Sequence, residues 1–225
     1  INIAWAAVPL YWFNQMDGRG PWDLNGSISE HQKLMAWYGK NDIPVEANEA
    51  HHWGMRDAPD VVFIVSAYLA AYNSRAFGVK DHIIQLMFNS PPGTSSAMDI
   101  AKMLAAMELI STLETKNFRI WKQTRTGLLS YPVNLDQARA HLATTVFVQM
   151  ALKPDILHVV GYPEANHAAT GIEVIESCSM ARKAIENALQ SELNLPGSEN
   201  IQKRVQELVA KAKILIEAIQ QLGVG

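Results

Sequence analysis

Residues 79–110, VKDHIIQLMFNSPPGTSSAMDIAKMLAAMELI, decide the fold of this chain. Residues 79–88 form a short run that is mostly apolar at both odd and even positions, so both faces of the segment are apolar. This is typical of a buried parallel strand. A turn with proline and glycine follows, and then apolar residues recur at three- and four-residue spacing, as in an amphipathic helix. That stripe consists of Ile100, Met103, Leu104, Met107 and Ile110. A strand followed by a helix that packs back on it is the repeating unit of an α/β protein.

The same unit recurs on both sides of this stretch. The other predicted strands lie at residues 3–13, 44–47, 118–124 and 156–162. Helical patterns separate them, notably at 60–77 and 135–152, and a last amphipathic helix is predicted at 198–222. Helix starts are predicted at the capping boxes Ser27-x-x-Glu30 and Thr170-x-x-Glu173 and at the N-cap candidates Ser96 and Asn134.

Five consecutive β/α units fit either a doubly wound sheet or part of a (β/α)8 barrel. A dinucleotide-binding sheet would carry a G-x-G-x-x-G turn after its first strand, whereas residues 14–20 read NQMDGRG. Polar residues follow every predicted strand, as a barrel mouth requires. We therefore predict an α/β fold: a partial TIM-type barrel of about five units over residues 1–192, with a C-terminal flanking helical segment over 193–225.

Composition and charge restrict the function classes. The net charge is −3, so no basic field favours a nucleic-acid or membrane-surface partner. No apolar run reaches the ~18 residues that span a bilayer. The single cysteine, Cys178, favours a reducing, cytoplasmic compartment and is expected to be a small core side chain. The sequence starts inside a predicted strand, without Met or a signal peptide, so we expect a piece of a longer protein with three further strands.

Every predicted strand ends in hydrogen-bonding or titratable side chains. The carboxyl ends of parallel strands share one rim, and gathering such groups there without a polar ligand would be costly. Strand alternation predicts that Lys122 points outward while Gln123 or Arg125 points inward. The strand-end groups are Asn14, Gln15, Asp17, Arg19, Glu46, Asn48, Glu49, His51, His52, Gln85, Asn89, Lys122, Gln123, Arg125, Thr126, Ser130, Tyr131, His158, Tyr162, Glu164, Asn166 and His167.

The turn SPPGTSS at residues 90–96 is the most specific local motif. Gly93 lets the backbone approach a ligand, and Thr94, Ser95 and Ser96 bring hydroxyls to the free N–H groups of a helix start. A proline-defined turn with a serine N-cap would explain the same residues without a ligand. Arg125, at the next strand end, favours phosphate binding because a guanidinium holds phosphate through two parallel hydrogen bonds.

Histidines and lysines give weaker signals. A metal site would draw its ligands from Glu49, His51, His158 and His167, but no H-E-x-x-H motif is present and we assign no metal. Lys80 and Lys102 are expected to be surface charges rather than lysines that form a Schiff base.

Most of the chain, from Val8 to Leu189, resembles the large subunit of the adenosylcobalamin- and pyridoxal-phosphate-dependent aminomutases, namely the lysine 5,6-aminomutases and ornithine 4,5-aminomutases. The resemblance is most specific in FNSPPGTSSAMDIAKMLA, which begins at Phe88, and around residues 164–167. The remaining segments are VPLYWFNQMDGRGPW from Val8, HHWGMRDAPDVV from His51, QTRTGLLS from Gln123 and QMALKPDILHVVGYPEANHAAT-x-x-x-VIESC from Gln149.

The resemblance implies a TIM barrel with pyridoxal phosphate at its mouth. It also implies adenosylcobalamin in a Rossmann-like domain, which the lysine enzymes carry on a smaller partner subunit; the chain has no D-x-H-x-x-G segment of its own. The implied reaction is a radical 1,2-migration of the terminal amino group of a basic amino acid. The cofactors supply the radical chemistry, and the barrel orients the substrate and excludes water.

The resemblance, taken with position in the chain, also suggests roles for individual residues. Ser95 and Arg125 are placed at the cofactor phosphate, with Thr94, Ser96 and Ser130 as secondary candidates. The candidates for covering the cofactor ring or taking part in catalysis are Tyr131, His51 and Glu164. The substrate candidates are Glu164 or Glu49 for an ammonium group, Arg19 for a carboxylate, and Asn166 and His167.

Two other hypotheses remain open at this point. One is a metal-dependent barrel lyase or isomerase, whose activity would be sensitive to chelation. The other is a non-catalytic barrel subunit, which would bind a partner but ignore pyridoxal phosphate. Lysine and ornithine differ by one methylene, and a change of that size need not leave a legible motif.

Overall fold

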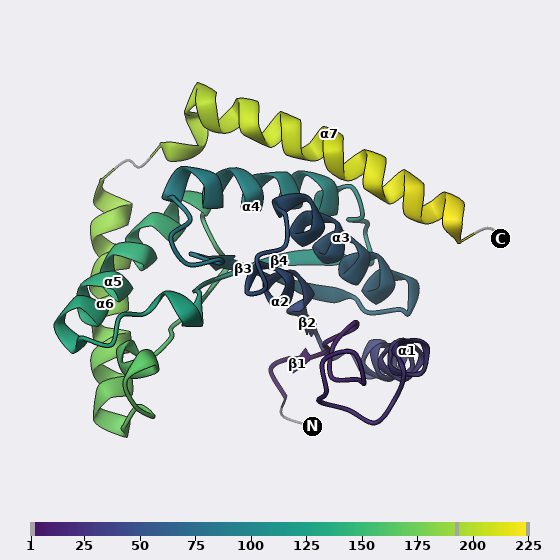
Figure 1. Ribbon diagram of the computed structural model, residues 1–225, viewed down its shortest axis with the longest axis horizontal. Helices are drawn as coiled ribbons and strands as arrows, with labels where there is room; N and C mark the ends of the chain where they lie inside the picture. The colour runs from purple at the N-terminus through teal and green to yellow at the C-terminus, as the bar shows by residue number, and fades with distance from the viewer. Residues whose placement is uncertain (1–2, 192–193, 224–225) are drawn as a thin grey trace.

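The chain folds as an α/β protein around a five-stranded parallel sheet (Figure 1). The computed structural model describes residues 3–191 and 194–223. Its strands are β1 (Ala6–Ala7), β2 (Val45–Ala47), β3 (Asp81–Phe88), β4 (Arg119–Thr126) and β5 (Ile156–His158). Its α-helices within those ranges are α1 (Leu24–Lys40), α2 (Glu49–Gly54), α3 (Asp60–Ala76), α4 (Ser96–Ser111), α5 (Leu135–Gln149), α6 (Gly171–Gln190) and α7 (Glu199–Leu222).

The strands follow one another across the sheet in chain order, from β1 to β5. A doubly wound sheet reverses this order at a switch point, whereas a barrel adds each strand beside the last. The order β1-β2-β3-β4-β5 contains no reversal, and the sheet curls into a half-barrel. The carboxyl ends of all these strands therefore face the same rim.

The outer face of the sheet is covered by helices. Ile84, Leu86 and Phe88 alternate along β3 and enter the largest core cluster together with buried side chains of α3, α4 and α7. In Figure 1, α7 runs across α4 and α3. The flanking helix therefore forms part of the main core. The predicted boundary between residues 192 and 193 lies outside the described residues.

Helix boundaries agree with most of the predicted capping signals. The Thr170–Glu173 capping box is formed at the start of α6, and Asn134 caps α5 by accepting from Asp136 and Gln137. Other predictions were wrong. Ser27 is buried inside α1, which Asp23 caps, and α4 is capped by Ser95 rather than Ser96.

Two further predictions need correction. The expected first strand at residues 3–13 pairs only over Ala6–Ala7, because the chain turns at Pro9, whose carbonyl accepts from Trp12 N. Cys178 is exposed on α6 and is not a core side chain. Among the helices of residues 3–191 and 194–223, none is both long and apolar enough to cross a bilayer.

Candidate functional site

The inner face of the half-barrel carries a hydrogen-bonded polar network. Strand register places Glu46, Gln85 and Gln123 on this face. The Glu46 carboxylate accepts from Gln85 Nε2 at 2.7 Å, from Gln123 Nε2 at 2.9 Å and from Trp5 Nε1 at 2.7 Å. Gln85 Nε2 also donates to Gln123 Oε1 at 3.1 Å. Side chains thus join three strands through a buried carboxylate that would otherwise lack partners.

Arg125 lies on the same face, two residues beyond Gln123 and level with His158 of β5. Its side chain is partly buried, and its buried Nε has no hydrogen-bond partner among the described residues. Burial lowers the pKa of Arg125, although the negative charges of Glu46 and Glu164 act in the opposite direction. A partly desolvated guanidinium with an unpartnered N–H is suited to binding an anion.

The short helix α2 contributes His51 to this mouth. The His51 imidazole is buried and interacts with the side chain of Gln85 and with the charge of Arg125. Desolvation, together with the charges of His52 and Arg125, holds the pKa of His51 well below its ordinary value of 6.5. His51 is therefore a neutral imidazole at the site.

Glu49 begins α2 but is fully buried. One of its carboxylate oxygens accepts from the Leu10 N–H. Desolvation raises the pKa of Glu49 to about 8, so the group is mostly protonated at neutral pH. This environment does not suit the predicted contact with a substrate ammonium, which needs an accessible negative charge.

Two hydroxyls of the predicted phosphate turn are engaged by the turn itself and by the start of α4. Ser95 accepts from Met98 N at 3.3 Å as the N-cap of α4, and the Thr94 hydroxyl donates to the Pro91 carbonyl at 2.7 Å. Ser96 is the first residue of α4, and it is exposed, as is Ser95. The structure thus places these hydroxyls at a helix start, but their hydrogen bonds are not with Arg125.

The loop after β4 brings Tyr131 towards Arg125. Tyr131 is buried, with its hydroxyl 3.4 Å from the Val160 carbonyl, and burial raises its pKa to about 12. The negative charge of the exposed Glu164 carboxylate acts to raise the pKa of both Arg125 and Tyr131. Three predicted residues are therefore gathered here. Ser130 is instead engaged by the Gly127 carbonyl at 2.7 Å and by His141 Nε2 at 2.8 Å.

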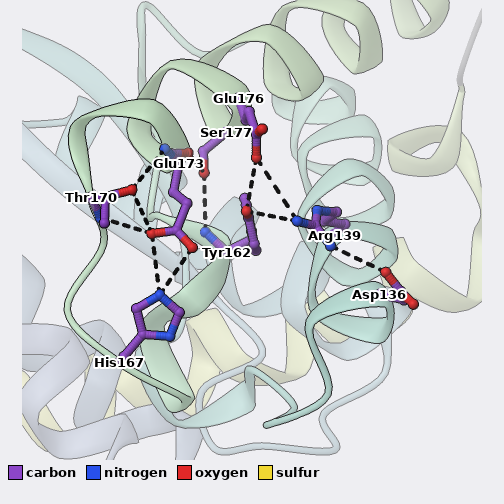
Figure 2. A network of polar contacts seen from close by, with 8 residues as sticks. All are labelled: Asp136, Arg139, Tyr162, His167, Thr170, Glu173, Glu176 and Ser177. Carbon is purple, nitrogen blue, oxygen red and sulfur yellow. Dashed lines mark hydrogen bonds and ion pairs between the residues drawn. The ribbon is translucent and has the colours of Figure 1, made fainter.

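Predicted substrate residues after β5 belong to a polar framework between α5 and α6. Figure 2 shows His167 directed at Glu173, the third helical residue in the capping box of α6, with His167 Nε2 and Glu173 Oε1 2.9 Å apart. In the same view the Tyr162 hydroxyl lies between Arg139 and Glu176, at 2.8 Å from each. Asn166 donates to the Val133 carbonyl at 3.0 Å.

Arg19 is exposed in the loop after β1. Its guanidinium pairs with Asp17 at 2.6 Å and lies 3.9 Å from the centroid of the Phe13 ring. The pKa of His52 is lowered, mainly by desolvation and to a smaller extent by the positive charge of Arg19. The side chain is accessible to a carboxylate, but part of its charge is already neutralised by Asp17.

Within the described part of the chain, no group of three or more His, Cys, Asp or Glu side chains is placed to hold a metal ion. In sequence comparisons, no family model and no curated protein matches this chain.

Sequence reasoning missed one buried charge beside the site. Lys102 was expected at the surface, yet its side chain is 1 % exposed and its Nζ donates to the Ser90 carbonyl at 2.8 Å. A carboxylate three residues earlier, Asp99, was the available signal, because this spacing places both groups on one helix face. Lys122 does point outward, as alternation predicts, and its ammonium group bonds to the Leu152 carbonyl at 3.1 Å.

Proposed function

We propose that this chain is the pyridoxal-phosphate-binding portion of a TIM-type barrel in an adenosylcobalamin-dependent aminomutase that acts on a basic amino acid such as lysine or ornithine. One observation carries the proposal: Arg125, on the inner face near the carboxyl end of β4, has a buried Nε to which no other described residue gives a hydrogen-bond acceptor. The resemblance of the sequence to the aminomutase large subunit gives the reaction class.

The residues around Arg125 fit a phosphorylated aromatic cofactor. Arg125 would hold the phosphate, and Ser90, whose buried hydroxyl also lacks a partner among the described residues, follows β3 at the same rim. Gly127 supports the close approach of these loops, since a Cβ there would lie 2.8 Å from the Asn89 carbonyl oxygen. Thr94, Ser96 and Ser130 remain secondary candidates for the phosphate, and Ser95, whose hydroxyl caps α4, is proposed beside Arg125.

The remaining groups suit binding and orientation. The neutral imidazole of His51 and the buried ring of Tyr131 would pack against the cofactor. Glu164, exposed at the rim, is a better candidate for a substrate ammonium than Glu49, which is buried and mostly protonated. Arg19 is the candidate for a substrate carboxylate, and Asn166 and His167 would support the rim.

When bound, the cofactors would supply the radical and the electron-accepting ring, and this chain would hold the pyridoxal phosphate and exclude water. We further propose that other strands complete the barrel and that adenosylcobalamin resides on a partner subunit or domain. The lone cysteine is compatible with a cytoplasmic location.

The test is a titration of pyridoxal phosphate into the protein with its cobalamin-binding partner, followed by ultraviolet–visible absorbance. Arg125→Met should weaken binding by about tenfold to a hundredfold, because a charge-assisted hydrogen bond is worth roughly 1.5–3 kcal/mol. Arg119→Met is the matched control, since Arg119 is the first residue of the same strand, at the end opposite to Arg125, and pairs there with Asp81. A wild-type complex that binds no pyridoxal phosphate would contradict the proposal, and metal analysis or partner binding would then test the rival functions.

A further inference from the structure

Lys102 is a buried ammonium group beneath the loop that joins β3 to α4. Its Nζ donates to the Ser90 carbonyl at 2.8 Å and lies 3.4 Å from Asp99 and 3.7 Å from Asp60. The Phe63 ring, 5.1 Å away, closes another side. Burying a charge is costly unless it is paired and hydrogen-bonded, so this position needs the acceptors around it.

Asp99 holds the same loop from the other side. Its side chain is fully buried, and Asp99 Oδ2 accepts from the Asn89 N–H at 2.6 Å. Asn89 has a φ of 54°, a left-handed conformation that is unfavourable for most residues other than glycine. Two charged side chains of α4 therefore form hydrogen bonds with the backbone of adjacent loop residues: Asp99 with the N–H of Asn89, and Lys102 with the carbonyl of Ser90.

The C-terminal helix is tied to this cluster. Arg204 of α7 donates to Asp60 Oδ2 at 3.2 Å, while Asp60 Oδ1 faces Lys102. The four groups carry two positive and two negative formal charges, so the cluster is balanced. A chain of ionic contacts thus runs from α7 through the start of α3 to the loop at the rim of the site.

We propose that Lys102 and Asp99 are positioning residues for the site, and that Arg204 supports them through Asp60. They fix the loop of residues 89–94 at the carboxyl edge of the sheet, beside Arg125. The consequence for ligand affinity rests on the proposed function, whereas the ordering of the loop does not. Replacing the buried charges should therefore loosen this loop without unfolding the sheet.

The test uses Lys102→Met combined with Asp99→Asn in the full chain. This pair removes both charges together, which avoids leaving one buried charge alone, and asparagine can still accept from Asn89 N. Hydrogen exchange of residues 89–95 should accelerate by about tenfold or more, while amides of β3 and β4 keep their wild-type rates. The affinity for pyridoxal phosphate should fall by about tenfold, because small displacements of binding groups are costly.

Two further variants keep the test decisive. Arg204→Gln lies on a partly exposed helix face and should produce a smaller change in the same direction, even if the double variant does not fold. Lys122→Met is the matched control, because Lys122 also bonds to a backbone carbonyl but on the outer face of β4. Wild-type exchange in residues 89–95 of the double variant and of Arg204→Gln would overturn the proposal, as would equal acceleration in β3. Faster loop exchange in a protein whose wild type ignores pyridoxal phosphate would retain the positioning role and reject the proposed function.

Discussion

Gln85 donates through Nε2 to the Glu46 carboxylate at 2.7 Å and so links β3 to β2 across the inner face of the half-barrel. Glu46 also accepts from Gln123 and Trp5, which brings three N–H donors to one buried carboxylate. Buried polar networks stabilise a fold to the extent that their members are satisfied, and here the Gln85 Oε1 atom is without a hydrogen-bond partner among the described residues. The same hydrogen bonds orient the side chain of Gln85, which interacts with His51.

Glu46→Gln should lower the free energy of unfolding by about 2–3 kcal/mol, since an amide cannot accept from all three donors and brings two donors of its own. The measurement is urea denaturation followed by circular dichroism. Glu108→Gln, an exposed change on α4, provides the control and should stay within about 0.5 kcal/mol. Equal stability of the two variants would show that the inner-face network contributes little.

We predict that Gly127 is required because the loop after β4 lies against the loop after β3 at this position. A Cβ at this position would lie 2.8 Å from the Asn89 carbonyl oxygen and 2.9 Å from that of Phe88, both of which belong to the backbone. Gly127→Ala should therefore destabilise the protein by about 1–3 kcal/mol. Gly171→Ala, at the start of α6, meets no atom within 4 Å and should not lower the thermal midpoint. If Gly127→Ala does not change the free energy of unfolding, these loops are not tightly packed against each other.

Arg125 should bind a ligand at the expense of stability. Because its guanidinium is partly desolvated and its Nε is unpartnered among the described residues, Arg125→Met should leave the free energy of unfolding unchanged or raise it by up to ~1 kcal/mol. Chemical denaturation without added ligand measures this. A loss above about 2 kcal/mol would indicate that Arg125 has a structural partner and would weaken its assignment to an anion.

The sequence was most informative where local pattern and tertiary environment agree. Side chains on both faces of the strand at residues 81–88 are buried, as the apolar run predicts. Helix α3 begins at Asp60, as expected. The first strand was overpredicted because aromatic and β-branched composition does not report where pairing stops. There the chain leaves the sheet after Ala7 and turns at Pro9.

Within the site, alternation along β4 predicted the direction of Lys122 and, as one of two options, the inward direction of Arg125. Burial of single charged residues was harder to predict. Lys102 and Glu49 have the side chains of surface residues, and the groups that enclose them come from distant segments: Asp60 and Ser90 for Lys102, and Leu10 for Glu49. Contacts of this kind depend on tertiary packing, which spacing in one sequence does not encode.

Glu49 makes stability depend on pH in a direction that can be stated in advance. Its folded-state pKa of about 8 lies above the ordinary value of 4.5, so the folded protein holds this proton more tightly than the unfolded chain does. The contribution of Glu49 is complete below pH 4.5 and is lost as pH rises towards about 8, by at most ~1.4 kcal/mol per pH unit. Acidification within this window therefore favours the folded state at this residue.

Glu49→Gln should remove that dependence, because glutamine is neutral at every pH and its carbonyl oxygen can still accept from Leu10 N. The thermal midpoint of the variant relative to wild type should therefore increase steadily between pH 4.5 and about 8. Differential scanning calorimetry over this range is the measurement. Glu186→Gln, an exposed change on α6, is the matched control and should show no such trend. A midpoint difference that stays constant with pH would mean that Glu49 is ionised in the folded protein, and Glu49 would then regain its place beside Glu164 as a candidate for the substrate ammonium.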